Sequence, residues 1–297
     1  MSVDLASLPP PAVIETLAFE TLLAECKADF VERFPAAAEV IDLESEPVVK
    51  LLESFAYREL KLRARYNDEA KSLLLAFAED ADLDHIGVTY YNGARRLVVT
   101  LADGSALPPT PAVMESNFDY RQRLAMQPEG ESVAGPRDGY RYHAMSAHGH
   151  VKDARPRRPV AGTVEVSVLS RIGNGLPDAG LIKVVEAALN EEAVRPMNDE
   201  VIVSPAKIVD YALDIGLVLF PGPAAEPVIG AVKAALEGFA QDHHRLGRDI
   251  VKSAIDAAAH VSGVKKVVIN SPAADIACGL DQAPWCSGIT VSIAGIE

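Results

Sequence analysis

The sequence predicts an α+β protein in which a helical N-terminal region is followed by two small α/β-type domains with mixed sheets. Residues 45–79 contain no glycine, and their apolar side chains recur with the period of a helix. Residues 163–203 have a strand–helix–strand pattern, which recurs after residue 208 with two helices in place of one. We therefore expect three regions: an N-terminal arm and helical region (1–95), a central α/β domain (96–205) and a C-terminal α+β domain (206–297).

The N-terminal region contains the most regular pattern in the chain, a long helix predicted over residues 45–79. Ser45 is a suitable N-cap, and Pro47 falls in the first turn, where its missing N–H costs little. A second apolar line, from Leu51 to Ala78, widens the first, so the helix is either core of its own domain or part of a bundle shared with other subunits. The first line has spacings of three, four and seven residues: Val48, Leu52, Phe55, Leu62, Tyr66, Ala70, Leu73 and Phe77.

The segments around this helix are punctuated by proline and glycine. Pro9, Pro10 and Pro11 predict an extended arm over residues 1–18, which is either a linker or a strap that lies on a partner. A helix is expected from Phe19 to the residue before Pro35. After residue 79, a short turn capped by Asp82 and ended by Gly87 is expected.

The two later regions show strand periodicity. Val164, Val166 and Val168 alternate with polar residues, which indicates a half-buried strand. In the central region we expect strands at 163–170 and 201–203 with a helix at 178–192 between them. In the C-terminal region we expect a strand at 208–220, a helix at 227–241, a second helix ending at residue 260, and strands at 264–269 and 289–293.

Composition excludes several functional classes. The net charge is −14, from 28 basic and 42 acidic residues, and this charge opposes binding to nucleic acid or to an anionic membrane. No run of about 18 uncharged apolar residues occurs, so no membrane insertion is expected. Three cysteines without C-x-x-C spacing, and an N-terminus without the pattern of a secretory signal, predict folding in a cytoplasm.

Motifs for catalysis or for cofactors are absent from the sequence. The P-loop pattern G-x-x-x-x-G-K-S/T and the G-x-S-x-G elbow do not occur, and the two histidine pairs lack metal-site spacing. Asp80, Asp82 and Asp84 alternate as in a calcium loop, but His85 stands where that loop needs glycine. We therefore expect no catalytic residue, no metal and no cofactor. The alternative is a cytoplasmic enzyme with an unrecognised active site, which would require a deep pocket with perturbed titratable groups.

A charged cluster marks the start of the helix that ends at residue 260. It comprises Arg245, Arg248, Asp249 and Lys252. Charges near a helix start are commonly a salt-bridged cap. The alternative is a recognition corner at a subunit interface.

Several stretches, in order and from near one end of the chain to the other, resemble one protein family. The resemblance is to the baseplate J proteins of P2-like contractile phage tails, a family shared with R-type bacteriocins. The matching stretches are residues 43–52, 56–59, 111–116 with Asp119 and Arg121, 132–136, 143–144, 168–171 with 173–175, 188–190, 194–196, Tyr211, 221–223 and 245–250.

This resemblance implies a structural role. Such a protein is expected to be a baseplate wedge subunit, present in two copies beside one smaller wedge protein, with six wedges around the central spike. The N-terminal helices would form a shared bundle, and paired C-terminal domains would link wedges into a ring that transmits the trigger for sheath contraction. Further neighbours would be the sheath-initiating baseplate protein and the central hub. The family implies no catalytic residue and no cofactor.

The resemblance also favours the shared-bundle explanation of the long helix. We expect the subunit interface to include Val48, Leu52, Phe55, Leu62, Tyr66, Leu73, Arg245 and Arg248. The protein is then made in the cytoplasm and becomes part of a tail baseplate in a virion or bacteriocin particle. A similar adaptor in another injection machine is the remaining alternative.

Overall fold

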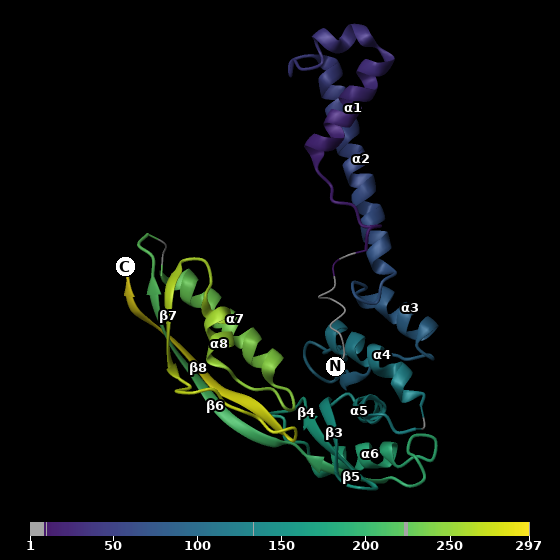
Figure 1. The fold of residues 1–297 in the computed structure, drawn as a ribbon, viewed down its shortest axis with the longest axis vertical. Coiled ribbons are helices and arrows are strands. Elements are labelled where there is room, and N and C mark those ends of the chain that lie inside the picture. The colour runs from purple at the N-terminus through teal and green to yellow at the C-terminus, as the bar shows by residue number, and fades with distance from the viewer. Residues whose placement is uncertain (1–8, 10, 133, 223–224, 297) are drawn as a thin grey trace. The chain divides into compact units, whose positions relative to one another are not determined.

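The computed structural model describes residues 9, 11–132, 134–222 and 225–296. It confirms the α+β class: helices dominate the first part, and sheets with helices against them form the rest (Figure 1). The chain divides into two compact units, Met1–Arg95 and Arg96–Glu297. Most of the predicted arm before Pro11, and Val133 and Pro223 of the family stretches, lie outside the described residues.

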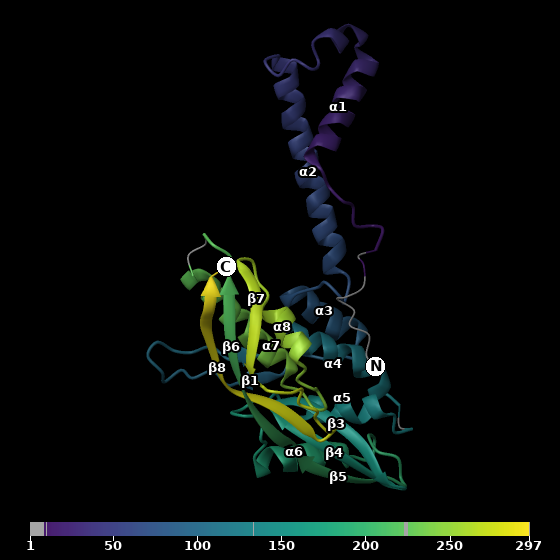
Figure 2. The same ribbon diagram turned by 60° about the vertical axis from the view of Figure 1, so that its left-hand side comes forward.

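The first unit is helical. Helices α1 and α2 lie side by side and run in opposite directions (Figures 1 and 2). Buried Leu22 on α1 and buried Leu52 and Ala56 on α2 belong to the core of this unit. The helices of the unit are α1 (Phe19–Arg33), a short 3-10 helix (Pro35–Glu39), α2 (Pro47–Ser72) and α3 (Asp80–Tyr90).

Helix α2 is shorter than the sequence predicts. It ends at Ser72 instead of residue 79, and its 26 residues span about 39 Å. The chain then turns, with Phe77 N–H and Ala78 N–H both donating to the Leu74 carbonyl oxygen at 2.9 and 2.8 Å. Residues 74–77 are all half-buried, so this run packs on several sides, which a single helical stripe would not allow. Glu46, without a side-chain cap, takes the N-cap position expected for Ser45.

The expected short turn at residues 82–87 is also wrong. Those residues belong to α3, where Leu83 and Ile86 are buried one turn apart on one side of the helix. Gly87 is inside this helix and buried, so it does not end it. Asp80 and Asp82 lie in the first turn, where acidic side chains favour the positive end of the helix dipole.

The second unit begins with a small hairpin and two helices, which precede a three-stranded sheet. Strands β3 and β4 are antiparallel, whereas β4 and β5 are parallel and are joined through α6, which confirms the predicted βαβ pattern. Ser116 caps α4 by accepting a hydrogen bond from Asp119 N–H at 3.1 Å. The elements are β1 (Val98–Thr100), β2 (Val113–Met114), α4 (Asn117–Gly130), α5 (Arg137–Ala147), β3 (Val151–Val160), β4 (Thr163–Ser170), α6 (Ala179–Leu189) and β5 (Glu200–Pro205).

The last third of the chain forms a second three-stranded sheet with the order β7-β6-β8, covered on one face by α7 and α8 (Figure 1). The core-facing side chains of β6 include Leu213 and Leu217, which pack with Val232 and Leu236 of α7. Strand β8 is far longer than the predicted 289–293. Its full length was missed because two register shifts interrupt the alternation of apolar and polar residues. The elements are β6 (Lys207–Leu219), α7 (Ala225–His243), α8 (Lys252–Ala259), β7 (Val264–Ser271) and β8 (Gln282–Ile296). The domain boundary at 205/206 stays a prediction.

Candidate functional site

A stripe of exposed apolar side chains runs along α2. We define the α2 stripe as Leu51, Phe55, Leu62, Tyr66 and, at the C-cap, Leu73. At 100° per residue, the four helical members fall within an arc of about 60°. Phe55, Leu62, Tyr66 and Leu73 are 49–78% exposed, values typical of surface residues despite their apolar chemistry. Within the described part of the chain, the stripe is therefore an exposed apolar surface.

A different face of α2 is filled within the chain. Val49, Leu52 and Ala56 are buried, with Leu52 only 8% exposed. This face lies about 100° from the stripe, on the side where α1 packs. The predicted interface residues thus separate: Leu52 contributes to the unit's own core, Val48 is half-buried, and Phe55, Leu62, Tyr66 and Leu73 are free to meet another surface. That they form a subunit interface stays a prediction.

The described part of the N-terminal arm lies on α2 of its own chain. Asn67 Nδ2 donates to the Glu15 carbonyl oxygen at 2.9 Å, and Glu15 N–H donates to Asn67 Oδ1 at 3.0 Å. Arg63 adds an ion pair to the Glu15 carboxylate at 3.3 Å. The role of Asn67 was missed from the sequence, because a single asparagine inside a helix looks like any other surface residue.

Charged side chains border the α2 stripe, and one of them, Glu69, falls within its arc. Arg65 and Glu69 form a salt bridge at 2.8 Å, and Arg63 and Glu59 form another at 2.6 Å. Exposed pairs of this kind contribute little to folding. An apolar centre with a charged rim is, however, the usual composition of a protein interface.

Arg245 lies in a largely buried polar network instead of on a free surface. Asp119 of α4 accepts hydrogen bonds from Arg171 at 2.5 Å and from Arg245 at 3.2 Å. Arg245 also donates to Gln122 Oε1 at 3.0 Å and lies over the Phe118 ring, 5.1 Å from its centroid. We call Asp119, Gln122, Arg171 and Arg245 the Asp119 network. Of the charged cluster predicted from the sequence, Arg245 thus forms a salt bridge, whereas Arg248 is exposed. A role for either residue in a subunit interface stays a prediction.

The electrostatics of the Asp119 network favour the charged carboxylate. Burial alone raises the pKa of Asp119, but Arg171 and then Arg245 outweigh burial, so its pKa lies below the usual value. Two guanidinium groups and one buried carboxylate form a unit that is costly to break, because removing one member leaves a buried charge without compensation. The network joins α4 and the turn that follows β4 to the loop after α7.

Further buried charges support the same region. Asp153 of β3 accepts from Arg141 at 2.8 Å and from Leu246 N–H at 3.1 Å. Arg123 and Glu115 form a fully buried pair at 2.7 Å. Sequence reasoning did not identify these pairs, because charged residues within amphipathic segments normally face solvent and nothing in their spacing shows which partner they meet.

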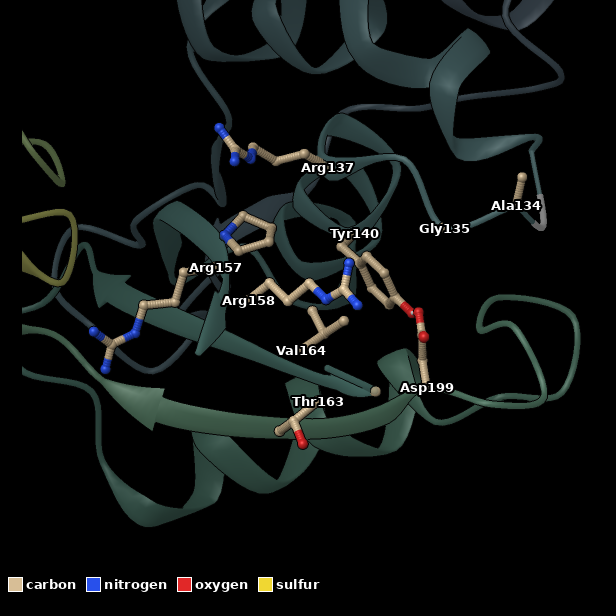
Figure 3. Close-up of a pocket in the computed structure, with 11 residues that line it drawn as sticks. Ala134, Gly135, Arg137, Tyr140, Arg157, Arg158, Thr163, Val164 and Asp199 are labelled. Carbon is tan, nitrogen blue, oxygen red and sulfur yellow. The ribbon is translucent and has the colours of Figure 1, made fainter. Parts of the chain in front are cut away.

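The larger depression in the second unit is lined by Arg137, Tyr140, Arg157, Arg158 and Asp199, among other residues (Figure 3). It has a volume of about 330 Å³, and Tyr140 Oη donates to Asp199 Oδ2 at 2.7 Å on its wall. Burial, and then Asp199, raise the pKa of Tyr140, so the hydroxyl stays protonated. Arg158 runs toward Tyr140, whereas Arg137 and Arg157 point away from it (Figure 3). The Tyr140–Asp199 bond links α5 to the turn before β5.

A smaller cavity of about 190 Å³ lies beside the Asp119 network and contains Lys152, His244 and Trp285. Burial and then the nearby Arg245 lower the pKa of Lys152 to about 8. His244 donates through Nδ1 to the Pro284 carbonyl oxygen at 2.7 Å, and burial lowers its pKa. The Cys286 thiol also lines this cavity and lies against the Tyr211 hydroxyl, and burial raises the pKa of both groups.

Neither a metal centre nor a membrane span is found among the described residues. No group of three or more His, Cys, Asp or Glu side chains converges there as metal ligands would. Among the helices that the structure describes, none combines the length and the apolar character needed to cross a bilayer. The most distinctive chemical feature of the described chain is thus the exposed apolar stripe on α2.

Three domains of one protein family match this chain in order. The Baseplate J-like N-terminal domain matches residues 44–103, the Baseplate J-like central domain matches 132–205, and the Baseplate J-like protein C-terminal domain matches 211–292. Baseplate protein J of Escherichia phage P2 is 47% identical over 300 residues, covering 99% of each chain. The chain belongs to the baseplate J-like family. The family resemblance read from the sequence is confirmed, and the chain is a structural protein of tail baseplates.

A solved structure was also found to resemble this baseplate J-like chain. It is the cryo-EM structure of the anti-feeding prophage baseplate, symmetrised six-fold, with 12% sequence identity and a TM-score of 0.40. The match covers 60% of this chain and 42% of that chain. The family assignment rests on the three domain matches and the phage P2 relative.

Proposed function

We propose that this baseplate J-like protein is a wedge subunit of a contractile tail. It assembles with a second copy of itself and a smaller wedge protein, and wedges join into a ring around the central spike. The observation that carries this proposal is the α2 stripe, whose Phe55, Leu62 and Tyr66 side chains are exposed on a helix that already packs against α1 by another face.

The energetics of the α2 stripe favour a shared bundle. Burying one Leu or Phe side chain completely stabilises a structure by about 1.5–3 kcal/mol. Five such side chains in a row, at spacings that repeat along one side of a helix, match the way in which neighbouring helices interlock. Helices from a second copy and from the smaller wedge protein are the partners that would cover them.

The C-terminal domains, in this proposal, pair and connect neighbouring wedges. The Asp119 network supports a mechanical role, because Arg245 in the loop after α7 is tied to Asp119 and Gln122 of α4. A displacement applied to the C-terminal domain would be passed on through these contacts instead of being absorbed by a loose joint. The ring would transmit the trigger for sheath contraction to the sheath-initiating protein, around the central hub.

Co-purification tests the proposal. The chain is co-expressed with a second, differently tagged copy and with the smaller wedge protein. A variant with Phe55→Asp and Leu62→Asp is compared with Tyr57→Asp, a control residue of similar exposure about 150° away around α2. We expect the double variant to lose the smaller wedge protein, while two copies of the chain still associate through their C-terminal domains, and we expect the control to keep the smaller protein. Complex formation that is equal for both variants would contradict the bundle.

A further inference from the structure

Strand β8 forms an open edge of the sheet β7-β6-β8 (Figure 2). Its first part is occupied, because Gly247 N–H donates to the Gln282 carbonyl oxygen at 2.8 Å and His244 donates to the Pro284 carbonyl oxygen. Over residues 288–296, the backbone pairs within the described chain with β6 alone. An open edge of this kind presents a row of N–H and C=O groups to whatever approaches it.

The chemistry of this edge is unusual for a soluble protein. Strand β8 contains no Asp, Glu, Lys, Arg or His, although 24% of the chain is charged. The opposite edge strand, β7, carries exposed Lys265 and Lys266. Natural proteins place charged side chains, lysine above all, on open edge strands, because these charges prevent the edge from pairing with another strand. Strand β7 has this protection and β8 does not, so the β8 edge has the character of a pairing surface.

The side chains of β8 also indicate that this edge is a pairing surface. In the parallel register, Ile289, Val291, Ile293 and Ile296 stand opposite Leu213, Ile215, Leu217 and Leu219 of β6. A bulge at Ala294 keeps Ile296 on this core-facing side. The four β6 side chains are at most 1% exposed, whereas Ile293 and Ile296 are 43% and 63% exposed. The apolar layer thus extends past β6 and is left uncovered at the edge.

We propose that residues 288–296 pair with the same residues of a second copy, antiparallel about a two-fold axis, to join two three-stranded sheets into one of six strands. This inference rests on the proposed pairing of C-terminal domains and names the surface that performs it. Identical edges related by a two-fold axis run antiparallel, and such a contact closes on itself instead of propagating into a fibre.

The absence of charged side chains along this edge fits a second copy as the occupant. With a net charge of −14, two copies repel one another over most of their surfaces. The uncharged edge allows them to approach without burying like charges. The exposed Ile293 and Ile296 rows would then cover each other, which a charged peptide could not do without leaving its own charges unpaired.

Disulfide trapping tests the contact in the full chain. Cys26, Cys278 and Cys286 are replaced by serine, and Ser292→Cys is introduced on the exposed face of β8. The matched control is Asn270→Cys, exposed on the β7 edge. Under mild oxidation we expect Ser292→Cys to form a covalent dimer and Asn270→Cys to stay monomeric. Equal trapping of both variants, or of neither, would overturn the proposal.

A second arm separates this contact from the α2 stripe. In the Phe55→Asp and Leu62→Asp background, we expect the chain to sediment as a dimer and the Ser292→Cys cross-link to persist. Adding Thr290→Lys and Ser292→Lys places like charges across the paired strands and should convert that dimer to monomer, whereas Asn270→Lys should not. Unchanged melting temperatures show that the variants fold. A dimer that survives the two lysines refutes the β8 edge and leaves the α2 stripe untouched.

Discussion

The α2 stripe and the Asp119 network are opposites in how their side chains are satisfied. On α2, Phe55 and Leu62 are apolar, and among the residues that the structure describes they remain exposed. Around Asp119, charged side chains are buried and hydrogen-bonded to one another. The first region is incomplete in a single chain and the second is complete. A subunit of a larger assembly needs both: open surfaces where partners bind, and rigid joints between them.

The largest expected effect is a difference in folding stability between substitutions at Leu52 and at Phe55, two nearby residues of α2. Leu52→Asp places a charge in the core between α1 and α2 and should destabilise the first unit by more than about 4 kcal/mol. Phe55→Asp changes an exposed residue and should shift folding stability by less than about 0.5 kcal/mol. Urea unfolding followed by circular dichroism measures both. Equal destabilisation would remove the distinction between the filled face and the stripe.

The Asp119 network gives the next largest effect. Asp119→Asn leaves Arg171 and Arg245 without their common counter-charge and should cost about 3–5 kcal/mol. Because the pKa of Asp119 is lowered in the folded protein, its contribution is present above the usual pKa and is lost as the pH falls through the folded value. The melting temperature, measured as the pH is lowered from 7 through the acidic range, reports this loss of stability. An unchanged melting temperature at pH 7 would show that the network adds no rigidity.

These two regions also show how far the sequence predicts the structure. The helical period located α1 and α2, and alternation located β4 and β6, because both patterns report which side of an element is apolar. The same period could not divide Leu52 from Phe55, since burial by α1 and burial by a partner require the same chemistry. The end of α2 was missed because the apolar run 73–78 continues the pattern through a turn.

The polar region was less accessible to sequence reasoning. Asp119, Arg171 and Arg245 are far apart in the chain, and each alone resembles a surface charge. The charged cluster at Arg245 and Arg248 was recognised, but only the fold shows that Arg245 turns inward while Arg248 is exposed. Pairings between distant charges depend on tertiary structure, which no local spacing encodes.

A smaller effect concerns pH. The pKa of Lys152 is lowered to about 8 by burial and by Arg245, so the unfolded chain binds more protons than the folded one between that value and the usual 10.5. Stability should therefore rise with pH across this window, and Lys152→Met should remove the rise. Unfolding at pH 8 and pH 10 compares the two proteins. A rise of equal size in Lys152→Met would assign it to another group.

The smallest expected effect is at the arm. Asn67→Ala removes two hydrogen bonds to Glu15 and should cost about 1–2 kcal/mol locally. We expect faster amide exchange over residues 11–18 with the α1–α2 core unchanged. Exchange that is the same in both proteins would show that the arm is held by other contacts.

The central claim, that other subunits cover the α2 stripe, is tested most directly by maleimide labelling. In a chain with its three native cysteines replaced by serine, Leu62→Cys and Tyr57→Cys are labelled free and after assembly with the smaller wedge protein. We expect both cysteines to react equally in the free chain and assembly to protect only Leu62→Cys. Leu62→Cys that stays as reactive in the assembly as in the free chain would contradict it.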